Sequence, residues 1–151
     1  MNLSDDERRG LTGLLNEVIP PNPDRGMPGA GDLGLAGIVA VALAKHPVVL
    51  DALKAGLATL DRVARGECGD AFSALAPGDR KRILGQVEDA GSVLVPMLAF
   101  PTYVAYYEHP EVLVALGREA RPPHPKGYEL EPFDPRLLES VRSRGRLYRE
   151  C

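Results

Sequence analysis

Cysteine is scarce in this sequence, and the two that occur, Cys68 and Cys151, form neither a C-x-x-C pair nor a metal-ligand cluster. Histidine is almost as scarce. Each histidine precedes a proline, and none has a second ligand three or four residues away, as a helical metal site would need (His46, His109 and His124). We therefore expect unpaired thiols, no disulfide framework and no metal bound by this chain.

The sequence also lacks an excess of charge of one sign. Eighteen basic and twenty-one acidic side chains give a formal net charge of -3, so the molecule as a whole does not attract nucleic acid or an anionic membrane. The arginine-rich end is flanked by acids and indicates a solvated tail or a contact with a partner protein (Arg142, Arg144, Arg146 and Arg149).

No apolar run is long enough to cross a membrane. A spanning helix needs roughly 20 apolar residues, and the segment Val93 to Tyr107 is interrupted by Pro96 and Pro101. We interpret it as a buried core helix with a kink. Residues 1–7 are acidic where a secretory signal is basic. As written, the chain is expected to be cytoplasmic, or periplasmic if a leader is missing or a partner exports it.

The remaining composition is that of an ordinary globular domain. Hydrophobic residues make up 44% and charged residues 26% of the 151 residues, a length that folds as one domain. The apolar pattern predicts an all-α fold: a compact bundle of about six helices with Pro/Gly-rich loops and an extended C-terminal arm. The single domain 1–151 has a core over about 3–117, the arm over 118–133, and a C-terminal helix and tail over 134–151.

The first predicted helix has a clear start and end. Ser4 and Glu7 form a capping-box pattern, an apolar face follows, and Pro20 stops the helix (the face is Leu11, Leu14, Leu15 and Val18). The segment 20–34 holds four prolines and four glycines, which predicts a loop. We expect Asp32 to cap the next helix, Leu33–Lys45, and Pro47 to separate it from the one after.

Apolar residues at spacings of three and four predict a long helix that packs against another (Leu50, Leu53, Leu57, Leu60 and Ala64). Asp61 and Arg65 form an i,i+4 pair on its solvent side, and Gly66 is expected to end it. Further helical segments are predicted over 70–75, where Phe72 enters the core, from 76–79 onward, and over 93–107, 111–116 and 136–142.

The stretch Gly29–Gly34 reads G-x-G-x-x-G and imitates a dinucleotide-binding fingerprint, with Asp51 placed like the acid that binds a ribose hydroxyl. The fingerprint needs a buried strand directly before its first glycine, because the strand end aims the amides of the turn at the pyrophosphate. Here a proline-rich loop precedes the stretch, and the leucine pattern places Asp51 in a helix. We therefore expect the stretch to open a helix and to bind no nucleotide.

No catalytic constellation can be proposed from the sequence. A triad needs a nucleophile, a base and an orienting group, and neither Ser73 nor Ser92 lies in a motif such as G-x-S-x-G. The chain is therefore expected not to be catalytic by itself.

Four of the eight aromatic residues lie in the segment 93–107. Phe100, Tyr103 and Tyr107 share one helical face, and Tyr106 lies on another. The preferred interpretation is core packing with each hydroxyl satisfied at the rim. The alternative is a contact patch for a partner.

Several short segments stand in a characteristic order between residues 11 and 128: Val18-Ile19-Pro20-Pro21, Pro28-Gly29-Ala30, Gly56-Leu57 with Leu60-Asp61, Phe72-Ser73-Ala74-Leu75, Tyr106-Tyr107-Glu108-His109-Pro110, Leu116-Gly117 and Pro123-His124-Pro125-Lys126-Gly127-Tyr128. In this order they resemble the family called gluconate 2-dehydrogenase subunit 3. The resemblance implies a helical subunit that accompanies a large flavin-dependent sugar or polyol dehydrogenase, assists its maturation or export, and leaves flavin and electron transfer to other chains.

The resulting hypothesis is a non-catalytic accessory subunit. Its partners would be a large flavoprotein dehydrogenase subunit, which carries the FAD, and as a further candidate a cytochrome subunit. Two alternatives stay open: a stand-alone small-molecule or nucleotide-binding domain, and a helical scaffold or regulator unrelated to dehydrogenases. The predicted partner interface consists of Pro20, Pro21, Pro28, Gly29, Ala30, Tyr106, Tyr107, Pro123, Pro125, Gly127 and Tyr128.

Overall fold

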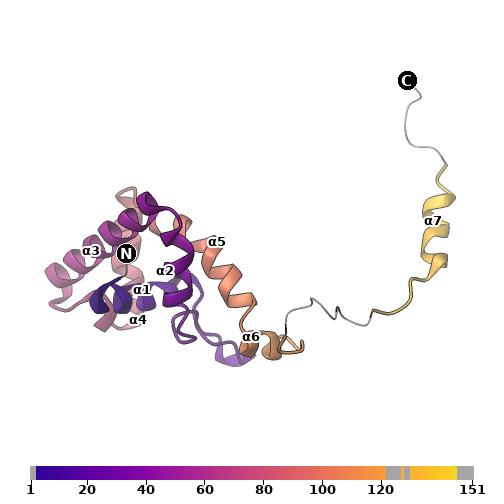
Figure 1. Cartoon of the computed structure of the whole chain (residues 1–151), viewed down its shortest axis with the longest axis horizontal. Helices are drawn as coiled ribbons and strands as arrows, with labels where there is room; N and C mark the ends of the chain where they lie inside the picture. Colours follow the sequence, from indigo (N-terminus) through magenta and orange to yellow (C-terminus); the bar gives the residue numbers. More distant parts are fainter. Residues whose placement is uncertain (1–2, 122–126, 128–129, 146–151) are drawn as a thin grey trace, which may run out of the picture. The chain divides into compact units, whose positions relative to one another are not determined.

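A computed structural model describes residues 3–121, 127 and 130–145 of the chain. These residues form seven α-helices, three short 3-10 helices and no strand, so the all-α prediction is confirmed. The chain divides into two units, Met1–Arg121 and Pro122–Cys151, which we describe separately (Figure 1).

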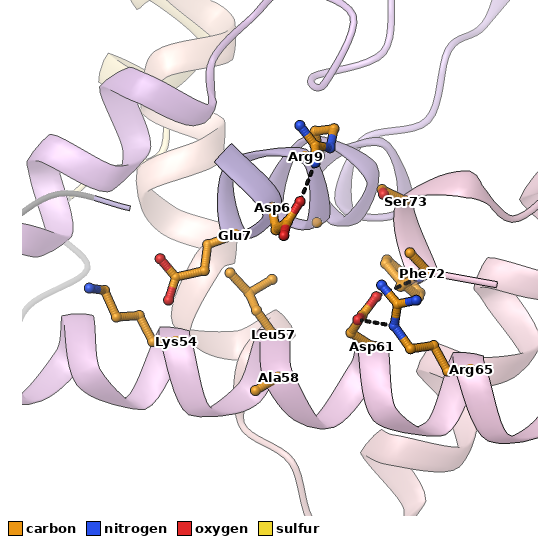
Figure 2. Close-up of a pocket in the computed structure, with 12 residues that line it drawn as sticks. Asp6, Glu7, Arg9, Lys54, Leu57, Ala58, Asp61, Arg65, Phe72 and Ser73 are labelled. Atoms are coloured by element: carbon orange, nitrogen blue, oxygen red, sulfur yellow. Dashed lines mark hydrogen bonds and ion pairs between the residues drawn. The ribbon is translucent and has the colours of Figure 1, made fainter. Parts of the chain in front are cut away.

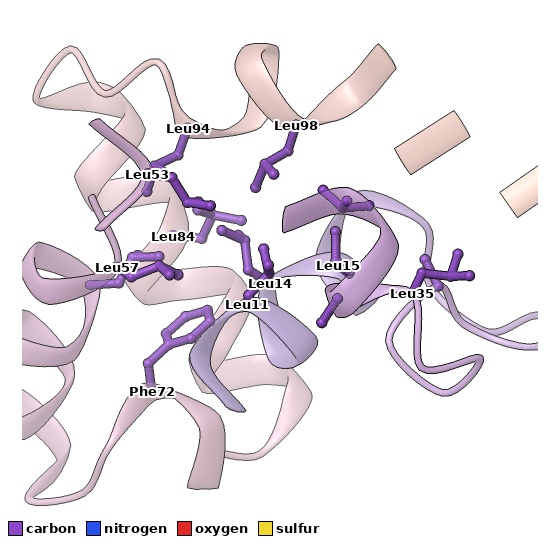
Figure 3. Close-up of a cluster of buried hydrophobic side chains, with 14 of the residues drawn as sticks. Leu11, Leu14, Leu15, Leu35, Leu53, Leu57, Phe72, Leu84, Leu94 and Leu98 are labelled. Carbon is purple, nitrogen blue, oxygen red and sulfur yellow. The ribbon is translucent and has the colours of Figure 1, made fainter. Parts of the chain in front are cut away.

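Helix α1 (Asp5–Val18) lies at the centre of the first unit. The Glu7 amide donates to Ser4 Oγ at 3.2 Å and the Ser4 amide donates to the Glu7 carboxylate at 2.7 Å, so the predicted capping box is present. On the apolar face of α1, Leu11, Leu14 and Leu15 are fully buried and Val18 is partly buried. Figure 3 shows how leucines and a phenylalanine of other elements surround it (Leu11, Leu14 and Leu15 of α1 with Leu53, Leu57, Phe72, Leu84, Leu94 and Leu98).

Helices α2 (Ala36–Ala44) and α3 (Pro47–Cys68) follow the loop and are separated at His46, as predicted. All five residues of the predicted leucine stripe on α3 are buried. The prediction that Gly66 ends this helix is wrong. The helix continues to Cys68 and ends at Gly69, whose φ of +82° lies in the left-handed region that glycine favours. An exposed glycine inside a helix costs only about 1 kcal/mol, which the packing of the leucine stripe offsets.

The next elements are η2 (Phe72–Ala74), α4 (Pro77–Asp89), α5 (Leu94–Tyr107) and α6 (Pro110–Ala115). They begin close to the predicted positions, and Phe72 is buried as predicted. Its amide donates to Asp61 Oδ1 at 3.0 Å, while Arg65 Nε donates to the other carboxylate oxygen at 2.7 Å. Asp61 therefore forms the predicted pair with Arg65 and also attaches η2 to α3.

A largely buried ion pair joins α4 to α1. Arg80 Nε lies 2.9 Å from Glu17 Oε1, and the two side chains are only 15% and 13% exposed. A second nitrogen of the same guanidinium donates to the Leu75 carbonyl oxygen at 3.0 Å. Arg80 thus binds two acceptors that are far apart in the sequence, and it holds the start of α4 against the end of α1.

The second unit contains η3 (Pro135–Leu138) and α7 (Glu139–Arg142). The predicted helix over 136–142 is therefore present, with its first turn in the tighter 3-10 geometry. Asp134 caps it, since its side chain accepts a hydrogen bond from the Arg136 amide at 3.0 Å. Residues 122–126 and 128–129 of the predicted extended arm 118–133 lie outside the described residues.

Candidate functional site

The glycine-rich stretch Gly29–Gly34 packs against α1. The amides of Gly31 and Asp32 donate to Asn16 Oδ1 at 2.7 and 3.3 Å, and the Ala30 amide donates to the Ile19 carbonyl oxygen at 3.0 Å. The approach is close enough that only glycine fits at position 31. A Cβ atom there would lie 2.2 Å from the carbonyl oxygen of Thr12.

The other amides of the stretch are engaged within it. The Gly29 amide donates to Asp32 Oδ2 at 3.3 Å, the Leu33 amide to the Gly29 carbonyl oxygen at 3.3 Å, and the Gly34 amide to the Gly31 carbonyl oxygen at 3.0 Å. All six amides are therefore occupied, and no strand precedes them within residues 3–28. A dinucleotide fingerprint needs available amides at the end of a strand, and this stretch offers neither.

The prediction that this stretch opens a helix capped by Asp32 is wrong. The stretch is a series of turns, α2 begins at Ala36, and its N-cap residue Leu35 makes no side-chain hydrogen bond. Asp32 instead accepts from the Gly29 amide and from Asn16 Nδ2, the latter at 2.9 Å. The sequence does not reveal this role because Asn16 lies sixteen positions earlier and reaches Asp32 only once the loop has folded onto α1.

A pocket of about 230 Å³ lies between the first turn of α1, the middle of α3 and η2 (Figure 2). Four of its charged side chains form two ion pairs, Arg9 with Asp6 and Arg65 with Asp61, and Glu7 and Lys54 also line it. The hydrogen bond that Arg65 donates to the Asp61 carboxylate raises the pKa of the Arg65 guanidinium. Ser73 lines the pocket, but none of the lining residues is a histidine or a cysteine. The pocket therefore offers no Ser–His pair, and its Asp6 and Asp61 carboxylates are already bound by arginines.

Helix α5 carries no charged residue, and both of its faces are apolar. The inner face is buried in the core (Leu94, Leu98, Thr102, Ala105 and Tyr106). The outer face is exposed at successive spacings of three and four, and we call it the outer stripe of α5 (Val93, Pro96, Phe100, Tyr103, Val104 and Tyr107). This spacing makes a continuous seam along one side of a helix. Phe100, at its middle, is 76% exposed.

The three tyrosines of α5 have different environments. Tyr106 is 1% exposed, and its hydroxyl donates to the Pro28 carbonyl oxygen at 2.7 Å. Burial raises the pKa of Tyr106, and neighbouring Tyr107 contributes to the rise. Tyr103 and Tyr107 are exposed and stack with ring centroids 6.4 Å apart. The core interpretation is thus confirmed for Tyr106 and wrong for Tyr103, Tyr107 and Phe100, because the helical pattern separated the two faces without showing which one lies inward.

An apolar groove of about 690 Å³ lies between α6 and the loop before the glycine stretch. Its lining residues include Met27, Pro28, Pro110, Val114 and Ala115, with Glu111 as the charged member. The Tyr106 hydroxyl bond to Pro28 connects this loop to α5. The loop that forms one wall of the groove is therefore bound to α5, the helix that carries the outer stripe. Pro110, on the other wall, lies only three residues after Tyr107 in the sequence.

The residues predicted as a partner interface fall into three groups. Pro20, Pro21, Tyr107 and Gly127 are exposed, and Pro28 lines the groove. Gly29, Ala30 and Tyr106 are buried within the chain itself and support the loop from inside. Pro123, Pro125 and Tyr128 lie outside the described residues. The assignment of all the residues in these three groups to a partner interface stays a prediction. Phe100, Tyr103 and Val104 were not among the residues predicted for this interface. The signal in the sequence that indicates an apolar surface here is the lack of any charged residue from 90 to 107.

Other features bear on site chemistry. Cys68 is a free thiol, as predicted, and Cys151 lies outside the described residues. His46 and His109 stand directly before α3 and α6, as predicted. In the part of the chain that the structure describes, no three potential ligands are grouped to hold a metal ion. No helix there is both long and apolar enough to span a bilayer.

Together these features define an all-α protein with an uncharged, uncovered helical face and no assembled catalytic group among its described residues. Comparison with known families is more specific. The family model described as gluconate 2-dehydrogenase subunit 3 matches residues 5–117, which include helices α1 to α6. The chain belongs to this family, as the resemblance predicted, and hence to the subunits of dehydrogenase complexes. Neither the curated proteins nor the solved structures compared with the chain gave a match.

Proposed function

We propose that this chain is a non-catalytic accessory subunit of a flavin-dependent sugar or polyol dehydrogenase complex, where it supports the maturation or stability of the large flavoprotein subunit. The outer stripe of α5 is the observation that carries this proposal. A helix that is apolar on all sides is normally buried on all sides, and here one face is uncovered in a chain of a dehydrogenase-subunit family.

The chemistry of the described residues supports the non-catalytic part of the proposal. The amides of Gly29–Gly34 are all engaged within the chain, and in the charged pocket beside α1 the Asp6 and Asp61 carboxylates are bound by arginines and no histidine is present. In this proposal FAD binds to the large subunit, and the chain contributes a folding and docking surface.

Co-expression with the large flavoprotein subunit tests this function. We expect the soluble yield, flavin content and dye-linked dehydrogenase activity of the large subunit to depend on this chain. As a control, Leu14→Asp places a charge in the fully buried core and should behave as if the chain were absent. Equal yield, flavin content and activity without the chain would contradict the accessory role.

A further inference from the structure

The outer stripe of α5 has the length and continuity of a helix-packing surface. Helix α5 has 14 residues, which corresponds to roughly 21 Å at the α-helical rise. The exposed positions alternate at three and four along this whole length, from Val93 to Tyr107, and such a seam accepts the side chains of a second helix. Tyrosine and phenylalanine are also enriched at protein interfaces, and tyrosine is enriched among the residues that dominate their binding energy.

The charges around the stripe restrict what can cover it. No residue from 90 to 107 is charged, so a partner surface with a charge facing the middle of the stripe would bury that charge unpaired, which is costly. At the C-terminal end of α5 the exposed Glu108 and the groove residue Glu111 add negative charge. The helix dipole is also negative there. The matching partner is therefore apolar along its length and basic at one end.

The area of the stripe helps to decide between occupants. An aromatic side chain buries roughly 150–250 Å². Phe100 is 76% exposed, Tyr103 and Tyr107 are about half exposed, and with the two valines they leave on the order of 500 Å² uncovered. A stable interface needs about 800 Å² from each partner. A second copy of this chain packed stripe to stripe would therefore fall short. A larger partner can cover the stripe, the groove between α6 and Met27-Pro28 and the surface around both, and so approach the required area.

We propose that an apolar helix of the large flavoprotein subunit lies along the outer stripe of α5, with its basic end toward Glu108 and Glu111, and that the same subunit extends into the groove beside α6. This docking assignment rests on the proposed function. In this assignment the contact surface consists of α5, α6 and the loop residues Met27 and Pro28. The buried residues Gly29, Ala30 and Tyr106 support that loop from inside the chain.

The test compares two matched exposed positions in the full chain, co-expressed with a tagged large subunit. Phe100→Glu places a charge in the middle of the stripe. Val48→Glu places the same charge on α3, at a side chain that is 81% exposed. Both variants should keep the circular dichroism spectrum and thermal midpoint of the wild type, because neither position is in the core. We expect Val48→Glu to co-purify with the large subunit like the wild type, and Phe100→Glu to be retained at least tenfold less.

A photo-crosslinking residue supplies an independent readout of contact. Placed at Val104 it should form a covalent adduct with the large subunit, and placed at Val48 it should not. Wild-type co-purification together with equal retention of Phe100→Glu would overturn the docking surface and leave the proposed function standing. Failure of the wild type to co-purify would contradict the proposed function itself. A homodimer that Phe100→Glu converts to a monomer would overturn the proposal in favour of a second copy.

Discussion

At the scale of single residues, Asn16 determines the conformation of the glycine stretch. One side-chain amide offers both an acceptor and donors. Here the oxygen accepts from the amides of Gly31 and Asp32, while the nitrogen donates to the Asp32 carboxylate. Gly29 and Gly31 are needed because the backbone lies close to α1 and to the loop's own side chains, and Gly34 because its φ is +69°. The resemblance to a nucleotide fingerprint follows from these backbone requirements.

Replacing Gly31 tests the close approach of the loop to α1. The Cβ of Gly31→Ala would lie 2.2 Å from the Thr12 carbonyl oxygen, so the backbone must shift. We expect the free energy of unfolding to fall by about 2–3 kcal/mol, the range for overpacking in a tight site. Urea denaturation followed by circular dichroism measures it. Wild-type stability in this variant would mean that the loop does not lie against α1.

Gly66→Ala is the matched control for Gly31→Ala. Nothing lies within 4 Å of a Cβ at Gly66, and the residue is exposed inside α3. The substitution should raise the free energy of unfolding by about 0.5–1 kcal/mol, because alanine favours a helix interior over glycine. A loss of stability would indicate that the helix ends at Gly66, as the sequence alone suggested.

Tyr106 links stability to alkaline pH. Its pKa is raised by burial and by Tyr107, so above the ordinary tyrosine value of about 10 the unfolded chain loses this proton while the folded chain keeps it. The stability from this group is thus complete below that value and is lost as the pH rises through the folded pKa. Tyr106→Phe should cost about 1–2 kcal/mol near neutral pH, since the Pro28 carbonyl oxygen loses its donor.

The cost of Tyr106→Phe should shrink as the pH rises above about 10, because the wild type loses this stability and the variant has none to lose. Urea denaturation at neutral and alkaline pH measures the difference. Tyr103→Phe removes the hydroxyl of an exposed tyrosine on the same helix and should change stability by less than about 0.5 kcal/mol. A cost of Tyr106→Phe that grows with pH would contradict the assigned direction.

At the scale of elements, the position of α4 depends on a polar contact that periodicity does not reveal. The apolar residues of α4 are few, and three of them are buried (Ile83, Leu84 and Val87). Arg80 adds the contact with Glu17 of α1 and with the Leu75 carbonyl oxygen. A charge pair that is shielded from water in this way stabilises one arrangement of the two helices, because removal of either partner leaves a charge unpaired.

Arg80→Met tests this contact. It leaves the Glu17 carboxylate shielded without its partner and should lower the free energy of unfolding by about 3 kcal/mol. Arg82→Met is the control on the same helix. Arg82 is 45% exposed and pairs with Glu67 and Asp79, so its loss should cost no more than about 1 kcal/mol. The double variant Arg80→Met with Glu17→Gln should recover part of the loss. Equal effects at Arg80 and Arg82 would contradict the structural role of the buried pair.

The elements could be predicted from the sequence where local signals are strong. The capping box of Ser4 and Glu7, the leucine stripe of α3 and the prolines at helix starts placed most boundaries within a few residues. Prediction failed where a local preference competed with packing. Gly66 is tolerated inside α3 because the leucine stripe of that helix is buried, and Asp32 binds Asn16 in preference to capping α2.

At the scale of the whole molecule, the first unit has a complete core around α1 and an incomplete covering around α5. The core explains why the family match extends over α1 to α6. The uncovered face fits the membership of a subunit family, since a helix with two apolar faces needs neighbours on both sides. The predicted interface at the proline-rich segments and the outer stripe of α5 are both surfaces that a larger partner could contact.

The sequence by itself determined the fold class, the order of the helices and the family, because these depend on periodicity, capping residues and short motifs that lie close together along the chain. Tertiary structure decided which face of α5 lies inward, that the glycine stretch packs on Asn16, and that Tyr106 is buried while Tyr103 and Tyr107 are exposed. The physical reason is that an apolar pattern identifies which residues share a helical face. Only the packing of other elements determines which of those faces is covered.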